Sequence, residues 1–387
     1  MRVLVFGTYD TSSHPRVGII ADGLRSHGMD VEECNVPLGL DTAGRVAMLA
    51  QPWRVPLLLL RLADRWWRLA RTARKMPRPD VILVGYLGHF DVRLARLLFR
   101  RTPIVLDHLI SASDTAKDRR LSSGGLKQVL LRAIDAGALK AATVVVVDTE
   151  EHRLALPEAD QERAVVVPVG APGYWFEAGA AAAAAREAAD PATDPATDPA
   201  PGPLSVVFYG LFTPLQGAPV ITEALAALDG AGVELTMIGR GQDSEAARSA
   251  APTDGSVRWL DWVPAAELPA LVAGHDVCLG IFGTGPKALR VVPNKVFQGA
   301  AAGCALITSD TEPQRRELGD AAVLVPPGDP AALAAALRKL AEDRGELDRM
   351  KQAARAAAED RFGPAAVVQP LVLQLSGERP PVPPRNP

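Results

Sequence analysis

The chain has few of the residues that cross-link secreted proteins, and it lacks the long apolar runs that cross membranes. Its three cysteines are odd in number. Two of them, Cys278 and Cys304, stand in apolar runs, so we expect reduced core thiols rather than disulfide bridges. No apolar run reaches the length of a membrane span. Met1 and Arg2 lead directly into a predicted strand, which argues against a signal peptide. These features favour a cytoplasmic protein.

A large net charge is absent as well. The formal net charge is −3 over 387 residues, so strong electrostatic binding of nucleic acid is not expected. The charge is divided unevenly along the chain. Residues 1–175 hold 24 basic and 19 acidic residues, whereas the remainder holds 18 and 26. The length is typical of two domains, and a hydrophobic content of 48% is sufficient for two cores.

The most informative stretch spans residues 283–310. The apolar run 276–282 before it predicts a buried strand. A glycine-containing loop follows, and Pro293 and Asn294 then mark the start of a helix that ends at Gly303. Residues 304–308 are the next predicted buried strand. The pattern therefore predicts a strand, loop, helix and strand in succession.

Three basic residues, Lys287, Arg290 and Lys295, crowd the loop and the first turn of this helix. The free backbone N–H groups and the dipole of a helix N-terminus favour an anion, and nearby cations strengthen that preference. The sequence therefore predicts an anion site here. The alternative is a strand–helix–strand unit with a solvated basic end.

The same stretch resembles the donor-binding segment of GT-B glycosyltransferases of the family 4 type. The resemblance rests on Pro293-Asn294-Lys295-Val296-Phe297-Gln298 and on Ala301-Ala302-Gly303 before the strand that ends at Thr308. It implies an α/β protein of two doubly wound, Rossmann-like domains facing across a cleft. It also implies transfer of a sugar from a nucleotide-diphosphate donor to a hydroxyl acceptor, with retention and without a metal or other cofactor.

The sequence departs from the family pattern at charged positions. The family has two glutamates eight positions apart, and here Arg290 and Gln298 stand in their places. The family loop that grips the diphosphate carries an Arg and a Lys, which are replaced by Leu211 and Gln216. We expect Arg290, Lys295 and Lys287 to supply the missing cations. The donor-binding residues that the resemblance and the charge pattern together imply are Arg16, Gly210, Arg240, Trp262, Lys287, Arg290, Asn294, Lys295 and Gln298.

The acceptor side is expected in the N-terminal half. The buried strand 102–107 ends in a polar loop, and α/β enzymes place their chemistry at such strand ends. The resemblance implies that His108 contacts the transferred sugar, with Asp107 as the rival catalytic residue. Ser111 and Asp114 of the same loop are expected near the acceptor. The alternative is that Asp107 and Ser111 cap local structure and His108 is a partly exposed loop residue.

Residues 53–78 form the most unusual predicted surface. Tryptophans and leucines alternate there with eight basic residues and the single acid Asp64. A basic amphipathic helix with tryptophans can lie on an anionic membrane, which suggests peripheral contact with the inner membrane face. The alternative is a helix that packs its apolar stripe into the first domain.

The predicted organisation has five parts. Residues 178–203 contain an alanine run and three Asp-Pro-Ala repeats, typical of a flexible or semi-extended linker. We predict an N-terminal acceptor-side domain over 1–177 and a nucleotide-sugar domain over 204–361. A crossover back to the first domain is predicted over 362–376, and a disordered tail over 377–387.

The function that the sequence favours is glycosyl transfer from a UDP-, GDP- or dTDP-linked sugar. A sugar-nucleotide epimerase and a non-catalytic GT-B partner protein remain as alternatives, the latter because of Leu211, Gln216, Arg290 and Gln298.

Overall fold

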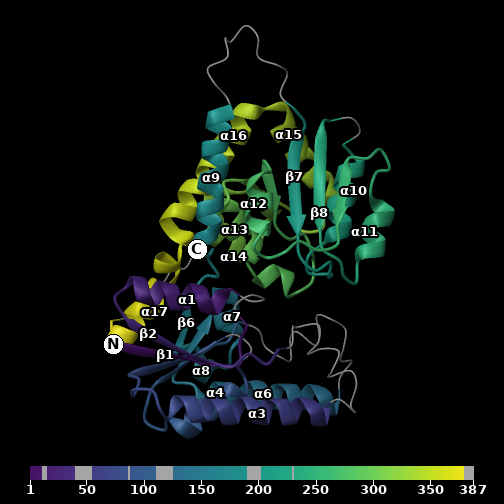
Figure 1. The fold of residues 1–387 in the computed structure, drawn as a ribbon. Helices are drawn as coiled ribbons and strands as arrows, with labels where there is room; N and C mark the ends of the chain where they lie inside the picture. The colour runs from purple at the N-terminus through teal and green to yellow at the C-terminus, as the bar shows by residue number, and fades with distance from the viewer. Residues whose placement is uncertain are drawn as a thin grey trace. The chain divides into compact units, whose positions relative to one another are not determined.

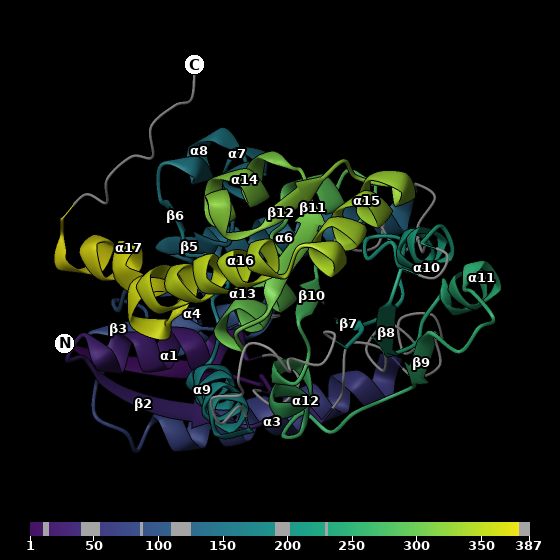
Figure 2. The same ribbon diagram turned by 90° about the horizontal axis from the view of Figure 1, so that it is seen from above.

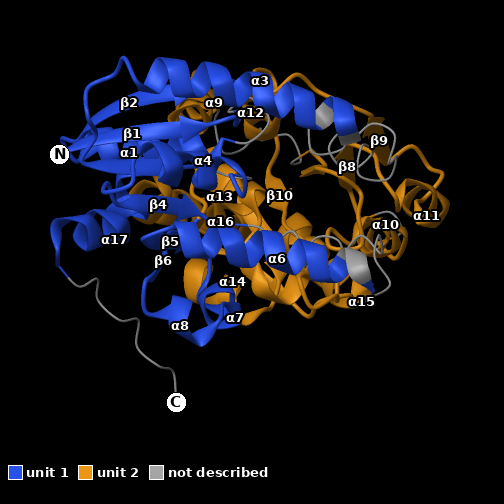
Figure 3. Cartoon of the chain, turned by 90° about the horizontal axis from the view of Figure 1, so that it is seen from below, with its two compact units in different colours: residues 1–168, 364–387 blue, residues 169–363 orange. Residues whose placement is uncertain are grey.

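The computed structural model describes residues 1–10, 15–39, 55–85, 88–109, 125–189, 202–228 and 231–378. These residues fall into two compact units (Figure 3). Unit 1 comprises residues 1–168 and 364–387, and unit 2 comprises residues 169–363. Each unit is described separately below.

Unit 1 is built on a six-stranded parallel sheet with the order β2-β1-β3-β4-β5-β6. Its strands are β1 (Arg2–Gly7), β2 (Asp30–Asn35), β3 (Val81–Val84), β4 (Ile104–Asp107), β5 (Val144–Val147) and β6 (Ala164–Val166). The described helices of this unit are α1 (Arg16–Ser26), α3 (Val55–Ala73), α4 (Asp91–Leu98), α6 (Leu126–Ala141), α7 (Glu150–Ala155), α8 (Glu158–Gln161) and α17 (Pro364–Ser376).

The central strands of unit 1 are continuous apolar runs, such as VILV in β3 and VVVV in β5. Such runs suit a parallel sheet, because helices cover both of its faces. Val3 and Val5 of β1 belong to the core formed with α1 and α17. Leu4 and Phe6 point to the opposite face and pack with α3, α4 and α6. Figure 1 shows these two helical layers on either side of the sheet.

Unit 2 has a second six-stranded parallel sheet with the order β12-β11-β10-β7-β8-β9. Its strands are β7 (Leu204–Tyr209), β8 (Val233–Ile238), β9 (Val257–Leu260), β10 (Val277–Leu279), β11 (Ala305–Ser309) and β12 (Val323–Val325). Its helices include α9 (Gly173–Ala189), α10 (Ala218–Ala226), α11 (Ser244–Ala250), α12 (Leu268–Ala273), α13 (Asn294–Ala301), α14 (Glu312–Leu318), α15 (Pro330–Glu342) and α16 (Arg344–Ala357). The short 3-10 turns η2 (Ala288–Arg290) and η3 (Gly319–Ala321) and the π turn η4 (Ala358–Phe362) complete it.

Helix α13 packs closely against the strand that precedes it. A Cβ at Gly299 would lie 2.6 Å from Cβ and 2.7 Å from Sγ of Cys278 in β10. Glycine therefore lets the helix approach the sheet without a gap. Figure 2 shows α16 alongside α13, and the two helices are in contact. The predicted strand, helix and strand around residues 276–308 are thus confirmed as β10, α13 and β11.

The linker prediction is wrong for residues 178–189, because α9 is helical through Ala189. The low-complexity composition led us to expect an extended segment, but alanine has the highest helix propensity of all residues. Residues 190–201 and 379–387 lie outside the described residues. Residues 169–177, which we assigned to the first domain, fall in unit 2. The three cysteines are free and buried, as expected of core thiols.

No helix within the described ranges combines the length and the apolar character needed to cross a membrane.

The packing of α1 on α17 yields a stability test. A Cβ at Gly23 would lie 2.2 Å from the Pro364 carbonyl oxygen and 2.6 Å from Val368. We expect Gly23→Ala to lower the free energy of unfolding by about 1–3 kcal/mol, because the helices cannot separate without losing core contact. Urea unfolding followed by circular dichroism measures this change.

Gly18→Ala is the matched control, because it lies in the same helix and a Cβ there meets nothing within 4 Å. This control should gain about 0.5–1 kcal/mol from reduced backbone entropy. Equal effects of the two substitutions would contradict the packing argument.

Candidate functional site

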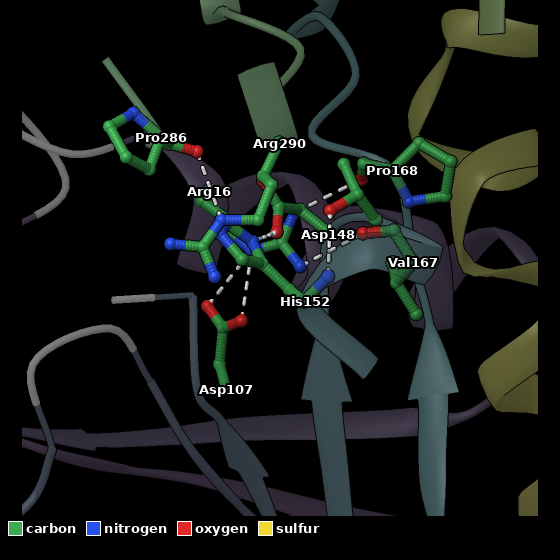
Figure 4. Close-up of polar contacts among 9 residues, drawn as sticks. Arg16, Asp107, Asp148, His152, Val167, Pro168, Pro286 and Arg290 are labelled. Atoms are coloured by element: carbon green, nitrogen blue, oxygen red, sulfur yellow. Dashed lines mark hydrogen bonds and ion pairs between the residues drawn. The ribbon is translucent and has the colours of Figure 1, made fainter. Parts of the chain in front are cut away.

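A buried ion pair lies at the carboxyl end of the unit 1 sheet. Arg16, the first residue of α1, donates from Nε to Oδ1 and Oδ2 of Asp107 at 2.9 and 3.1 Å. The two terminal nitrogens of Arg16 donate to the carbonyls of Pro168 and Val167 at 3.1 and 2.9 Å (Figure 4). Each side chain of the pair is at most 3% exposed. The pair therefore ties the start of α1 to the ends of two strands.

This pair changes the interpretation of both residues. Arg16 is not an exposed residue at a helix start, because its guanidinium is buried. Burial raises the pKa of Asp107, as does the nearby carboxylate of Asp148, and the charge of Arg16 lowers it. Because both carboxylate oxygens of Asp107 accept bonds from Arg16, its observed contacts are structural. The donor contact of Arg16 and the catalytic role of Asp107 stay predictions.

His108 follows Asp107 and is buried rather than partly exposed. Its backbone N–H donates to the Val146 carbonyl at 2.8 Å, which extends the β4–β5 ladder. Its ring packs edge-on against His89, with centroids 5.4 Å apart. His89 Nε2 in turn lies 3.2 Å from Oδ1 of Asp135 on α6. Both imidazoles are therefore fixed at this edge. Ser111 and Asp114 lie outside the described residues.

Asp91 is a buried carboxylate of this edge that sequence reasoning missed. One of its oxygens accepts bonds from the backbone N–H and the hydroxyl of Thr8, both at 2.8 Å. The other accepts a bond from the indole N–H of Trp66 at 2.8 Å. Asp91 thus fixes the loop after β1 to α3 and α4. An acid at the start of a predicted helix was the available signal, but its partners are distant in sequence.

Asp148 and His152 form a second pair that sequence reasoning missed. Asp148 directly follows β5, and its Oδ1 lies 2.5 Å from Nδ1 of His152 on α7 (Figure 4). Thr149 caps this helix by accepting a bond from the backbone N–H of His152 at 3.2 Å. Unit 1 therefore presents two carboxylate-anchored side chains, Arg16 and His152, at neighbouring strand ends.

In unit 2, closely packed glycine loops form the carboxyl end of the sheet. A Cβ at Gly239 would lie 2.0 Å from the Gly210 carbonyl oxygen, and one at Gly283 would lie 2.3 Å from the Pro214 carbonyl oxygen. Gly210 and Gly239 have φ values of +142° and +121°, which favour glycine. The loops after β7, β8 and β10 therefore approach one another through their backbones. Such loops suit close contact with a ligand at strand ends.

The side chain of Lys295 reaches this edge from inside unit 2 rather than from solvent. It is the second residue of α13, it is 4% exposed, and its Nζ donates to Oε1 of Gln216. Nζ also lies 3.7 Å from the centroid of the Phe208 ring, a cation–π distance. Burial lowers the pKa of Lys295 from its ordinary value of 10.5 to about 7. Sequence reasoning placed a cation here but did not foresee its burial.

Lys295 nevertheless reaches the loop in which the family places its diphosphate-binding Lys. Gln216 occupies that place here, and it accepts the Lys295 bond. A Cβ at Gly210 would lie 3.4 Å from Lys295 Nζ. The structure therefore brings Lys295 to Gly210 and Gln216, which lie far from it in the sequence.

Gln298 is held in the same buried layer. Its Oε1 accepts a bond from the Tyr209 hydroxyl at 2.8 Å, and it is 7% exposed. The Tyr209 ring stacks on Trp175 of α9, with centroids 5.9 Å apart. Burial raises the pKa of Tyr209 well above its ordinary value, so the hydroxyl stays protonated and donates. The side-chain oxygen of Gln298 is thus held by the Tyr209 hydroxyl.

The remaining predicted donor residues are more accessible. Arg290 Nε donates to the Pro286 carbonyl at 3.0 Å (Figure 4), and Lys287 precedes the same η2 turn. Asn294 opens α13 on the exposed side, Arg240 is exposed, and Trp262 is 75% exposed. Trp259 instead packs against the core of unit 2.

The cavity found in unit 2 lies away from these strand ends. Its volume is about 510 Å³, and α9, the C-terminal end of α13 and α16 line it. Lys351 pairs with Asp276 at 3.0 Å, and Arg355 pairs with Glu359 at 3.0 Å. Arg186, a third lining cation, donates to the Ala273 carbonyl at 2.6 Å. Because each of these cations already has a partner, this cavity is a poor candidate for the anion site.

The architecture of two parallel sheets with helices is shared with solved GT-B glycosyltransferases. HepE of Anabaena, crystallised with UDP and glucose, is 15% identical with a TM-score of 0.66, covering 97% of this chain and 100% of that one. Sucrose-phosphate synthase of Thermosynechococcus elongatus is 13% identical with a TM-score of 0.68, covering 97% and 98%. At such identities the likeness establishes the fold alone.

Sequence comparison gives two partial matches. Residues 203–343 match the family described as glycosyl transferases group 1. A phosphatidyl-myo-inositol mannosyltransferase of Mycolicibacterium smegmatis is 33% identical over 144 residues. That match spans 36% of this chain and 36% of the relative. The fold implied by residues 293–308 is therefore confirmed, and the family match covers residues 203–343, whereas the roles of single site residues stay predictions.

The depressed pKa of Lys295 yields a prediction about ligand affinity. Between pH 7 and 10.5 the free lysine binds more protons than the buried one, so the unfolding free energy rises with pH in this window. A bound diphosphate favours the protonated form, so binding above pH 7 takes up a proton. We expect the Kd for UDP-glucose, measured by calorimetry, to rise between pH 7 and 9 by up to about tenfold per pH unit.

Lys295→Met should bind more weakly at pH 7 and lose this pH dependence, whereas Lys287→Met should keep it. Neighbouring Cys278 and Tyr209 do not titrate in this range, because burial raises the pKa of each well above its ordinary value. A wild-type Kd that is constant from pH 7 to 9 would show that Lys295 does not bind the diphosphate.

Proposed function

We propose that this protein transfers a sugar from a nucleotide-diphosphate donor to a hydroxyl acceptor, with retention and without a metal ion. The observation that carries the proposal is the convergence of Gly210, Gln216 and Lys295 at the carboxyl end of the unit 2 sheet. This edge lies within residues 203–343, which match the group 1 glycosyl transferases. HepE, which shares the fold, was crystallised with UDP-glucose.

The proposed chemistry is electrostatic. Departure of the nucleotide diphosphate leaves negative charge on its terminal phosphate. Buried Lys295 would meet that charge at low dielectric, where a cation is worth more than in water. Arg290 of the η2 turn would add a second positive charge. Gln298, replacing a glutamate, would contact the ribose through its amide nitrogen, because Tyr209 already holds its oxygen.

Donor turnover tests this assignment. We expect Lys295→Ala and Arg290→Ala each to lower kcat for UDP release, Lys295→Ala by about 10²–10³-fold, the loss typical when one stabilising donor is removed. Lys339→Ala is the matched control, because this lysine is 65% exposed on α15 and pairs with Glu346. Nucleotide release by all variants at the wild-type rate would contradict the site assignment.

Two further measurements in the same assay address the finer claims. Turnover should persist in EDTA, and proton NMR of the product should show the anomeric configuration of the donor. Tight binding of UDP-, GDP- and dTDP-sugars without turnover against a broad acceptor panel would instead favour a non-catalytic partner protein. A new sugar nucleotide formed without any acceptor would favour an epimerase.

We further propose that the acceptor is presented at an anionic membrane surface, through α3. One stripe of this helix is core, since Leu69 and Ala73 are buried and Trp66 packs against them. The opposite stripe leaves Leu57, Leu60 and Trp67 at 48%, 70% and 61% exposure. These three are spaced by three and seven residues, so they share one face. The packing interpretation of residues 53–78 therefore applies to one side of α3, and the membrane interpretation is our proposal for the opposite side.

The charges beside this apolar stripe favour anionic lipid. Arg61, Arg68 and Arg71 are exposed, and the guanidinium of Arg71 lies 5.5 Å from the centroid of the Trp67 ring. The one acid of the helix, Asp64, is already paired with Arg65 and Arg68. Leucine and tryptophan can enter the headgroup region while arginines attract its phosphates.

Vesicle flotation tests the membrane contact. Wild-type protein should float with vesicles of phosphatidylcholine and phosphatidylglycerol and much less with phosphatidylcholine alone. Leu60→Asp with Trp67→Asp should reduce the bound fraction at least about tenfold, because two buried apolar groups are lost. Leu154→Asp, at an exposed leucine of α7, is the control and should bind normally. Unchanged flotation of the double variant would contradict the α3 assignment.

A further inference from the structure

His152 is held by two independent bonds at the carboxyl end of the unit 1 sheet. Its ring Nδ1 lies 2.5 Å from Asp148 Oδ1, and its backbone N–H donates to Thr149 Oγ1. The Asp148 side chain is 4% exposed and sits on the strand end that adjoins Asp107 in the sheet. Anchoring of both ring and backbone is more than a helix cap requires, since Thr149 alone satisfies the cap.

The pairing fixes the chemistry of the imidazole. A carboxylate accepts hydrogen bonds, so the proton of the neutral ring lies on Nδ1 and the lone pair on Nε2. In the described part of the chain, Asp148 is the partner found for the ring of His152. The side chain is 17% exposed, so part of the ring reaches solvent. Nε2 is therefore oriented to accept a hydrogen bond from a hydroxyl group.

The location agrees with that chemistry. Parallel α/β sheets bind ligands outside the carboxyl ends of their strands. At this edge β4 ends in the Arg16–Asp107 pair and His108, and β5 ends in the Asp148–His152 pair. The guanidinium of Arg16 already donates hydrogen bonds to Asp107 and to two backbone carbonyls, so few of its N–H groups can bind a ligand. In the Asp148–His152 pair, by contrast, Nε2 of the His152 ring can still bind a substrate.

We propose that His152, held by Asp148, binds the acceptor by accepting a hydrogen bond from its reacting hydroxyl at Nε2. Asp148 is then a positioning residue that sets the tautomer and the ring orientation. The inference rests on the proposed function, because it names the group that orients the acceptor in that reaction. It requires no covalent step by His152.

Two isosteric substitutions separate this role from a structural one. The amide of His152→Asn can occupy the Nδ1 position and keep the bond to Asp148, but it offers nothing at the Nε2 position. The amide of His152→Gln can reach the Nε2 position but loses the Asp148 bond. With octyl β-glucoside as acceptor, we expect His152→Asn to lower kcat/KM for the acceptor by about tenfold, the value of one substrate hydrogen bond.

The same variant should keep the wild-type Tm and the wild-type KM for the donor, and His152→Gln should recover part of the acceptor kinetics. Arg153→Gln is the control on the same helix, because it breaks only the ion pair with Glu150 and a bond to a backbone carbonyl. Wild-type acceptor kinetics in His152→Asn would overturn the proposal, since a merely structural histidine is replaced by asparagine without loss.

A binding measurement keeps the inference separate from turnover. Long-range ¹H–¹⁵N NMR of the wild-type protein should show Nδ1 protonated, and octyl β-glucoside should shift the Nε2 resonance of His152. This arm gives its answer even if no donor is turned over, an outcome that would count against the proposed function alone. A Nε2 resonance that stays in place at every glucoside concentration would overturn the role of His152.

Discussion

The ion pair of Arg16 and Asp107 is the interaction on which the carboxyl end of the unit 1 sheet depends. Burying one charge without the other would cost several kcal/mol, so the two residues constrain each other's position. The planar guanidinium also bonds the carbonyls of residues 167 and 168, where the chain leaves the sheet. A single side chain thereby fixes the start of α1, the end of β4 and the segment after β6. The histidines at this edge are oriented relative to that frame.

Unit 2 also has a buried cation at the carboxyl end of its sheet, but this cation is a lysine. The difference has chemical consequences. Both buried cations stand in the first turn of a helix that follows a strand, Arg16 in α1 and Lys295 in α13. Arg16 has a carboxylate partner, Asp107, at 2.9 Å. Lys295 has a neutral amide and an aromatic face, so its charge depends on what else is bound nearby. The first arrangement suits a scaffold, and the second suits a site that responds to an anion.

The sequence predicted the elements of the fold well because their signals are local. Runs such as VVVV at 144–147 and the Pro293–Asn294 helix start report buried strands and a helix end directly. The sequence could not predict which way Lys295 points. Three cations near a helix N-terminus suggest a solvated cluster, whereas burial of one of them depends on Gln216 and Phe208, far away in the chain. The low-complexity composition before residue 190 predicted a linker, whereas the high helix propensity of alanine agrees with the observed helix α9.

The Asp148–His152 pair shows where a local signal was present but insufficient. A spacing of four residues predicts a side-chain contact within a helix, but Asp148 precedes the helix cap. The extended cap residue Thr149 brings the strand-end carboxylate over the first helical turn, and this geometry produces the contact. A sequence pattern of acid, cap and histidine after a buried strand could therefore be searched for in other α/β proteins. Gln216 and Gln298, where the sequence departs from the family pattern, are similar cases. The contact of each amide, with Lys295 or Tyr209, depends on a residue that is distant in the sequence.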